Sequence, residues 1–192
     1  NATNAVALTP GSIASAFAYR RELGKDRAIL GVFLPPAVVG AVLGAVLLLL
    51  TPQKIFDAIV PLLVLFATLL LLVQNLRKAP PATHDAAWSV PQSKAVAALL
   101  QLTIGLYGGY FGGGMGIMML ALYSRMGGSD IHRMNGIKSV VGAAINGVAS
   151  IAFVVAGAID WRAGVVMAIG AVIGGFVGAA GARRVRPSIV RW

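Results

Sequence analysis

The sequence predicts an all-α polytopic membrane protein with inverted structural repeats and a glycine-rich segment that is broken or re-entrant. Three observations lead to this fold class. Only 11% of the 192 residues are charged and 58% are hydrophobic, whereas about a quarter of a typical soluble domain is charged. The charges cluster between long neutral runs. One of those runs contains a dense group of glycines, and parts of the sequence repeat internally.

Five stretches have the length and neutrality of membrane-spanning helices. They contain no Asp, Glu, Lys or Arg and cover residues 28–53, 58–76, 95–124, 139–159 and 163–182. Each is about 19 residues or longer, and about 20 residues of helix cross the hydrocarbon core of a bilayer. Barrel strands alternate over about ten residues, so a transmembrane barrel is excluded. A further neutral run covers residues 1–19.

Basic residues and prolines mark the boundaries between the segments. The first, 4–19, ends at the basic stretch AYRREL, and the next ends at the Thr-Pro pair 51–52. A polar, proline-rich loop follows the third segment, and Ser89 and Pro91 mark a helix start after it. The expected helical segments are 4–19, 28–50, 55–75, 95–126, 134–157 and 163–183.

Lys and Arg are distributed unevenly among the loops. The loops after 4–19, 55–75, 95–126 and 163–183 hold four, three, two and four of them, and the two other loops hold one each. Cytoplasmic loops carry an excess of Lys and Arg. If the first three segments cross the membrane in turn, the basic loops all lie in the cytoplasm only when the segment 95–126 enters and leaves on the same side.

The stretch GGYFGGGMG, Gly108 to Gly116, lies in the middle of that segment, and six of its nine residues are glycine. Glycine allows backbone conformations that a tight turn needs. Non-helical backbone is tolerated at membrane depth where protein or a water-filled cavity covers it. We therefore expect a re-entrant hairpin of two half-helices. The alternative is one long helix, because Gly108, Gly112 and Gly116 also fit a small-xxx-small packing stripe.

An internal repeat connects the two halves of the chain. NAVALTPGSIAS (4–15) aligns with NGIKSVVGAAIN (135–146), and GAVLGA (40–45) aligns with GGFVGA (174–179). The basic loops fall on opposite sides of the two copies, which indicates inverted repeats, a pattern typical of transporters. The predicted organisation is a first repeat over 1–76 that lacks its N-terminal glycine-rich segment, a cytoplasmic linker loop over 77–94, and a second repeat over 95–192 that lacks its last helix.

Composition excludes several other classes. The net charge of +10 lies in loops between apolar runs, without a basic face that would indicate nucleic-acid binding. The 192 residues contain no cysteine, and the two histidines lie in separate loops, so we expect no metal site and no cofactor. No cleavable signal peptide is evident. The absence of convergent His, Asp, Glu or Cys inside the apolar runs argues against an enzyme.

The sequence resembles the sulfite exporter TauE/SafE family of membrane permeases. The resemblance rests on three stretches of the second half and on the NATNAVALTPG and AYRREL stretches of the first. The three are GLYGGYFGGGMGIMMLAL (105–122), HRMNGIKSVVGAAINGVASIAF (132–153) and GAIDWRAGVVMAIGAVIGGFVGA (157–179). It implies a multi-pass protein of the bacterial inner membrane that transports sulfite, sulfonates or related small anions, usually outward.

Lys138 is the first candidate for a substrate site. It lies about one turn inside an apolar segment, where an ionisable group is costly and is a functional hypothesis by default. Asn135, Gly142 and Asn146 share its helix face, and Ser139 lies beside it. A cation with amide and hydroxyl donors suits a small oxyanion. The alternatives are that Lys138 extends to the headgroups and that the asparagines join helices by hydrogen bonds.

The remaining candidates come from the first repeat and from the glycine-rich segment. The full predicted set of substrate-binding or path residues is Asn4, Ser15, Tyr110, Gly112, Gly113, Gly114, Gly116, Asn135, Lys138, Ser139 and Asn146. For Tyr110, packing is the alternative to a place on the path. Half-helix N-termini at the hairpin tip would add backbone donors.

Together these observations predict an inner-membrane exporter of small sulfur oxyanions or related organic anions, driven by the membrane potential. An ion-coupled uptake permease and a non-transporting membrane assembly protein are the alternatives. The expected partners are the lipid bilayer and a small anion, with a homo-oligomer left open and nucleic acid excluded.

Overall fold

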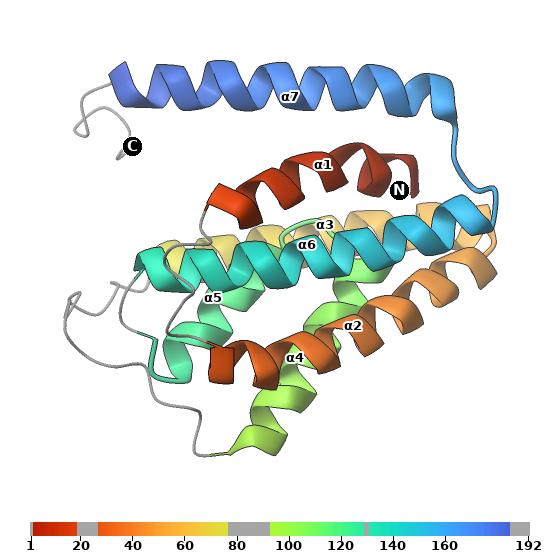
Figure 1. Cartoon of the computed structure of the whole chain (residues 1–192). Helices are drawn as coiled ribbons and strands as arrows, with labels where there is room; N and C mark the ends of the chain where they lie inside the picture. The colour runs from red at the N-terminus through yellow and green to blue at the C-terminus, as the bar shows by residue number, and fades with distance from the viewer. Residues whose placement is uncertain (1, 19–26, 77–92, 129–130, 185–192) are drawn as a thin grey trace.

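The computed structural model describes residues 2–18, 27–76, 93–128 and 131–184. Within this part all regular structure is helical, and the helices are α1 (Ala2–Ala18), α2 (Arg27–Leu50), α3 (Gln53–Leu76), α4 (Lys94–Tyr110), α5 (Met115–Arg125), α6 (Ile131–Val155) and α7 (Trp161–Arg184). Figure 1 shows α1 lying between α6 and α7, with α2 and α4 on the far side of α6. The all-helical prediction is confirmed for the described residues. The predicted linker lies mostly outside them.

Length and composition identify three helical stretches that are long and apolar enough to cross a membrane. These stretches are Arg27–Leu50, Gln53–Leu70 and Arg133–Val155. The apolar stretch Trp161–Ala171 of α7 is shorter. Many large apolar side chains of α2, α3 and α7 are exposed, Leu50, Leu62 and Val166 among them. Such surfaces suit lipid, because the hydrocarbon core is as apolar as these side chains.

The glycine-rich stretch interrupts the helical segment predicted over 95–126. Helix α4 ends at Tyr110, and α5 begins at Met115. Between them Gly112 and Gly114 have φ angles of +79° and +78°, a region that costs a side-chain-bearing residue about 1–2 kcal/mol. Two of the residues between the helices thus adopt a backbone conformation that favours glycine.

Helices α2 and α4 pack closely through small residues. A Cβ atom added to Gly40 would meet backbone of Leu102 and Leu106, and one added to Gly44 would meet backbone of Leu106 and Tyr110. The contacts advance along both helices together, so α2 and α4 run in the same direction. Small side chains let the two backbones approach, which is a common way to join helices in a membrane.

Contacts between α2, α5 and α6 show that the ends of these helices lie close together. The rings of Phe33, near the start of α2, and Tyr123, near the end of α5, lie 4.7 Å apart. A Cβ atom at Gly128 would meet the backbone oxygen of Tyr123 and the side chain of Met134, near the start of α6. The starts of α2, α4 and α6 and the end of α5 therefore lie at one end of the molecule.

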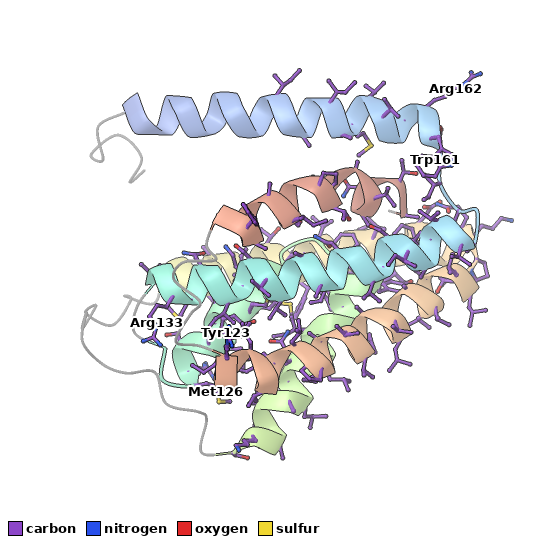
Figure 2. The ribbon with its side chains drawn as sticks, in the orientation of Figure 1. Tyr123, Met126, Arg133, Trp161 and Arg162 are labelled. Atoms are coloured by element: carbon purple, nitrogen blue, oxygen red, sulfur yellow. The ribbon has the colours of Figure 1, made fainter. Side chains whose placement is uncertain are left out.

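We call this the basic end, because it carries Arg27, Lys94, Arg125 and Arg133. Figure 2 shows Arg133 there with Tyr123 and Met126, and it shows Trp161 and Arg162 at the opposite end.

Candidate functional site

A cleft of about 490 Å³ lies between α1, α6 and the glycine turn. Its polar lining combines side chains of α1 and α6 with the backbone of the turn. The polar and glycine residues that line it are Asn4, Gly11, Ser12, Ser15, Gly108, Gly109, Gly112, Gly113, Gly116, Lys138, Ser139, Gly142 and Asn146. The structure thus brings together residues that are more than 120 positions apart in the sequence.

Polar side chains join α1 to α6 along one line. The hydroxyl oxygens of Ser15 and Ser139 lie 3.0 Å apart. The amide nitrogen of Asn146 donates to the hydroxyl oxygen of Ser12 at 2.9 Å. The partner number on α6 falls as the number on α1 rises, so the two helices are antiparallel.

A third pair continues this line beyond the cleft. The hydroxyls of Thr9 and Ser150 lie 2.7 Å apart. Ser150 is buried, with 7% of its surface exposed. Its hydroxyl therefore needs a protein partner, and Thr9 supplies it.

Lys138 contributes the cation of the cleft. Its side chain is half-buried, and a Cβ atom at Gly116 would meet its Cδ atom at 3.5 Å. Its ammonium donates a hydrogen bond of 2.8 Å to Oδ1 of Asn135, one turn earlier on α6. Because Asn135 is neutral, this bond orients the ammonium and leaves its positive charge in place.

The start of α5 lies on the other side of the cleft. Met115 and Gly116 are the first residues of that eleven-residue helix, and both line the cleft. The N–H of Met115 donates to the carbonyl oxygen of Gly112 at 3.4 Å, and those of Ile117 and Met118 donate to the carbonyl oxygen of Gly114. The helix dipole makes this end of α5 positive. Ammonium, hydroxyl and amide groups and the positive end of α5 thus face a common space. This is the chemistry that binds an oxyanion.

The turn itself is held from outside the cleft. The hydroxyl of Tyr107 donates to the carbonyl oxygen of Gly113 at 2.7 Å. The ring of Tyr107 lies 6.0 Å from that of Phe66 on α3 and 5.9 Å from that of Phe111, which lines the cleft.

The predicted site residues fall into two groups. Asn4, Ser15, Gly112, Gly113, Gly116, Lys138, Ser139 and Asn146 line the cleft. Asn135 lies outside the lining but bonds Lys138. Gly114 is the cap residue that directly precedes α5, and Tyr110 is buried with its ring 5.9 Å from that of Phe56.

Sequence reasoning missed Ser12 and Thr9. Both hydroxyl side chains take part in the contact between α1 and α6. The signal was available, because Thr9, Ser12 and Ser15 recur every third residue and so lie along one side of a helix.

The described residues contain no group of three or more His, Cys, Asp or Glu that could hold a metal ion. Asp57 is exposed and accepts a hydrogen bond from Gln53. Asp160 is also exposed and caps the start of α7. The cleft is therefore built from neutral and cationic groups in the part of the chain that the structure describes.

The chain matches the model of one protein family over its whole length. The family described as sulfite exporter TauE/SafE matches residues 1–192. No curated protein and no solved structure matches the chain.

Proposed function

The chain belongs to the sulfite exporter TauE/SafE family, a family of membrane transporters and not of enzymes, and from this membership we propose how it works. It exports sulfite, sulfonates or related small organic anions across the bacterial inner membrane, driven by the membrane potential. With the inside negative, each negative charge that moves outward gains about 2.3 kcal/mol per 100 mV. Such an exporter needs no proton relay within the membrane.

The observation that carries this proposal is the positive charge of Lys138 in the cleft, which has no carboxylate beside it among the lining residues that the structure describes. Lys138 bonds the neutral amide of Asn135, and Ser139 and Asn146 on the same helix line the same space. The start of α5 faces them. In this site Lys138 attracts the anion, the hydroxyls and amides replace its hydration water, and the backbone of the glycine turn completes the set of donors.

The contacts between helices support the inverted repeat. Helices α1 and α6, which are counterparts in the sequence repeat, are antiparallel, and Gly11 and Gly142 both line the cleft between them. Helix α1 packs on α7 as α6 packs on α2. We therefore propose residues 1–76 and 95–192 as the two repeats, with the substrate site at their interface.

The positions of the helix ends support a re-entrant hairpin. The ring pair Phe33–Tyr123 brings the end of α5 to the start of α2, and α2 runs in the same direction as α4. The segment then starts and ends at the basic end. Because Lys and Arg mark the cytoplasmic side, we propose that the basic end faces the cytoplasm.

Flux from proteoliposomes tests this function. The full-length protein is reconstituted in vesicles loaded with sulfite, and efflux is recorded at an inside-negative potential and at a clamped zero potential. We expect the negative potential to accelerate efflux. A proton gradient that drives flux at zero potential would instead support the ion-coupled permease. No flux of sulfite or of any tested sulfonate would reject this substrate class.

A further inference from the structure

Gln101 on α4 is the most unusual buried residue outside the cleft. Its side chain has no exposed surface. Neither its amide nitrogen nor its amide oxygen has a hydrogen-bond partner among the residues that the structure describes. Burying an unpaired amide is costly, and a bilayer offers no water to relieve it. Packing alone would favour an apolar side chain at this position.

The helix geometry places Gln101 between the cleft and the basic end. It precedes Gly108 by seven residues, so the two share one face of α4 and are about 10 Å apart along its axis. A Cβ atom at Gly108, which lines the cleft, would meet side chains of Met115 and Ile145. The face of α4 that carries Gln101 is therefore turned toward α5 and α6, on the side of the basic end.

The register of α2 and α4 locates Gln101 relative to an aromatic pair. A Cβ atom at Gly105 would meet backbone of Ala37. Gln101 precedes Gly105 by four residues and Phe33 precedes Ala37 by four. Because α2 and α4 run in the same direction, Gln101 and Phe33 lie at the same height along the two helices. The ring of Phe33 lies 4.7 Å from that of Tyr123, and both side chains are fully buried.

Met119 lies between this layer and the cleft. It lines the cleft, is fully buried, and precedes Tyr123 by one turn of α5. The route from the cleft to the basic end thus meets a flexible thioether side chain first. The layer of Gln101 and the two rings comes next.

We propose that Gln101 is a polar binding position on the cytoplasmic half of the transport path. When the side chains of Met119 and the aromatic pair move aside, its amide group donates to the passing oxyanion or to that anion's hydration water. This inference rests on the proposed function, and it identifies a second position in the path below the Lys138 cleft.

The first test separates stability from transport. Gln101→Met keeps the volume and removes the amide, and Thr103→Val removes a hydroxyl from an exposed position of the same helix. We expect Gln101→Met to leave the melting temperature equal or higher, because an unpaired buried amide is lost. We expect its efflux rate to fall at least about tenfold, against no change in Thr103→Val.

Unchanged efflux in Gln101→Met would overturn the inference. A melting temperature several degrees below that of the parent would also overturn it, because it would show that the amide is hydrogen-bonded in the folded protein. If the parent protein itself moves no anion, the proposed function fails first.

The second test does not depend on flux. The 192 residues contain no cysteine, so Gln101→Cys introduces a single thiol into them. We expect a small anionic methanethiosulfonate reagent to label it at least about tenfold faster than the thiol of Thr103→Cys, and a small sulfonate to slow the labelling. A Gln101→Cys protein that folds and stays unlabelled would show a closed core and overturn the inference.

Discussion

The ammonium of Lys138 donates a 2.8 Å hydrogen bond to the amide oxygen of Asn135, one helical turn earlier on α6. A carboxylate in place of Asn135 would neutralise the cation, whereas the amide orients it and preserves its charge. The pair supports the proposed function, because a positive charge that no carboxylate neutralises attracts an anion. The first prediction follows from this contrast.

Asn135→Asp is expected to weaken anion transport more than Asn135→Ala. The new carboxylate forms an ion pair with Lys138 and competes with the substrate, whereas alanine only releases the ammonium. We expect the KM of Asn135→Asp to be at least about tenfold higher than that of Asn135→Ala, which corresponds to ~1.4 kcal/mol of lost affinity. Flux measured against substrate concentration gives the two KM values. Equal values would show that the charge at this position does not act on the substrate.

Gly114→Ala is expected to destabilise the protein by about 1–2 kcal/mol, because φ at this position is +78°. Gly147→Ala is the matched control. No heavy atom lies within 4 Å of a Cβ atom at Gly147, inside helix α6, so alanine there should be neutral or stabilising by about 0.5–1 kcal/mol. Thermal unfolding in detergent compares the two variants. Equal melting temperatures would show that the turn does not require glycine at residue 114.

Gly105→Ala should loosen the contact between α2 and α4. Its new methyl group would collide with backbone of Ala37, which cannot rotate away as a side chain does. Overpacking of this kind costs about 1–3 kcal/mol. Gly31→Ala on α2, where no heavy atom lies within 4 Å of the added Cβ, controls for helix propensity. A melting temperature for Gly105→Ala as high as that of Gly31→Ala would contradict the close packing.

Asp160 is predicted to act as a helix cap and not as a proton carrier. Its Oδ1 accepts hydrogen bonds from the backbone nitrogens of Arg162 and Ala163 at 3.0 and 3.1 Å. Asp160→Ala should cost about 1 kcal/mol of stability. Asp160→Asn should retain both the cap and the flux, because asparagine caps equally well without titrating. A loss of flux in a stable Asp160→Asn protein would indicate a role in proton coupling.

The helix positions could be predicted closely from the sequence. The segment expected over 28–50 is α2, Arg27–Leu50, and that expected over 134–157 is α6, Ile131–Val155. Long neutral runs fix such segments because the bilayer sets their length. The break at Phe111–Gly114 follows from local glycine chemistry.

The partners of the side chains could not be predicted in the same way. The polarity of Lys138 and Asn146 within an apolar run predicts them as site residues, and the internal repeat adds Ser15. The pairing of Asn146 with Ser12 depends on how α1 crosses α6. The burial of Tyr110 against Phe56 depends on the position of α3. Both contacts are tertiary, and no local pattern specifies them.

The most direct test of the central claim is the effect of Lys138 on potential-driven efflux of sulfite. The full-length parent, Lys138→Met and Lys138→Arg are reconstituted at equal density, and initial rates are compared at one inside-negative potential. The proposed anion site predicts a fall of at least about tenfold for Lys138→Met and substantial flux for Lys138→Arg, which keeps the charge. Flux of Lys138→Met equal to that of the parent would contradict the claim, because the ammonium would then serve only to reach the lipid headgroups.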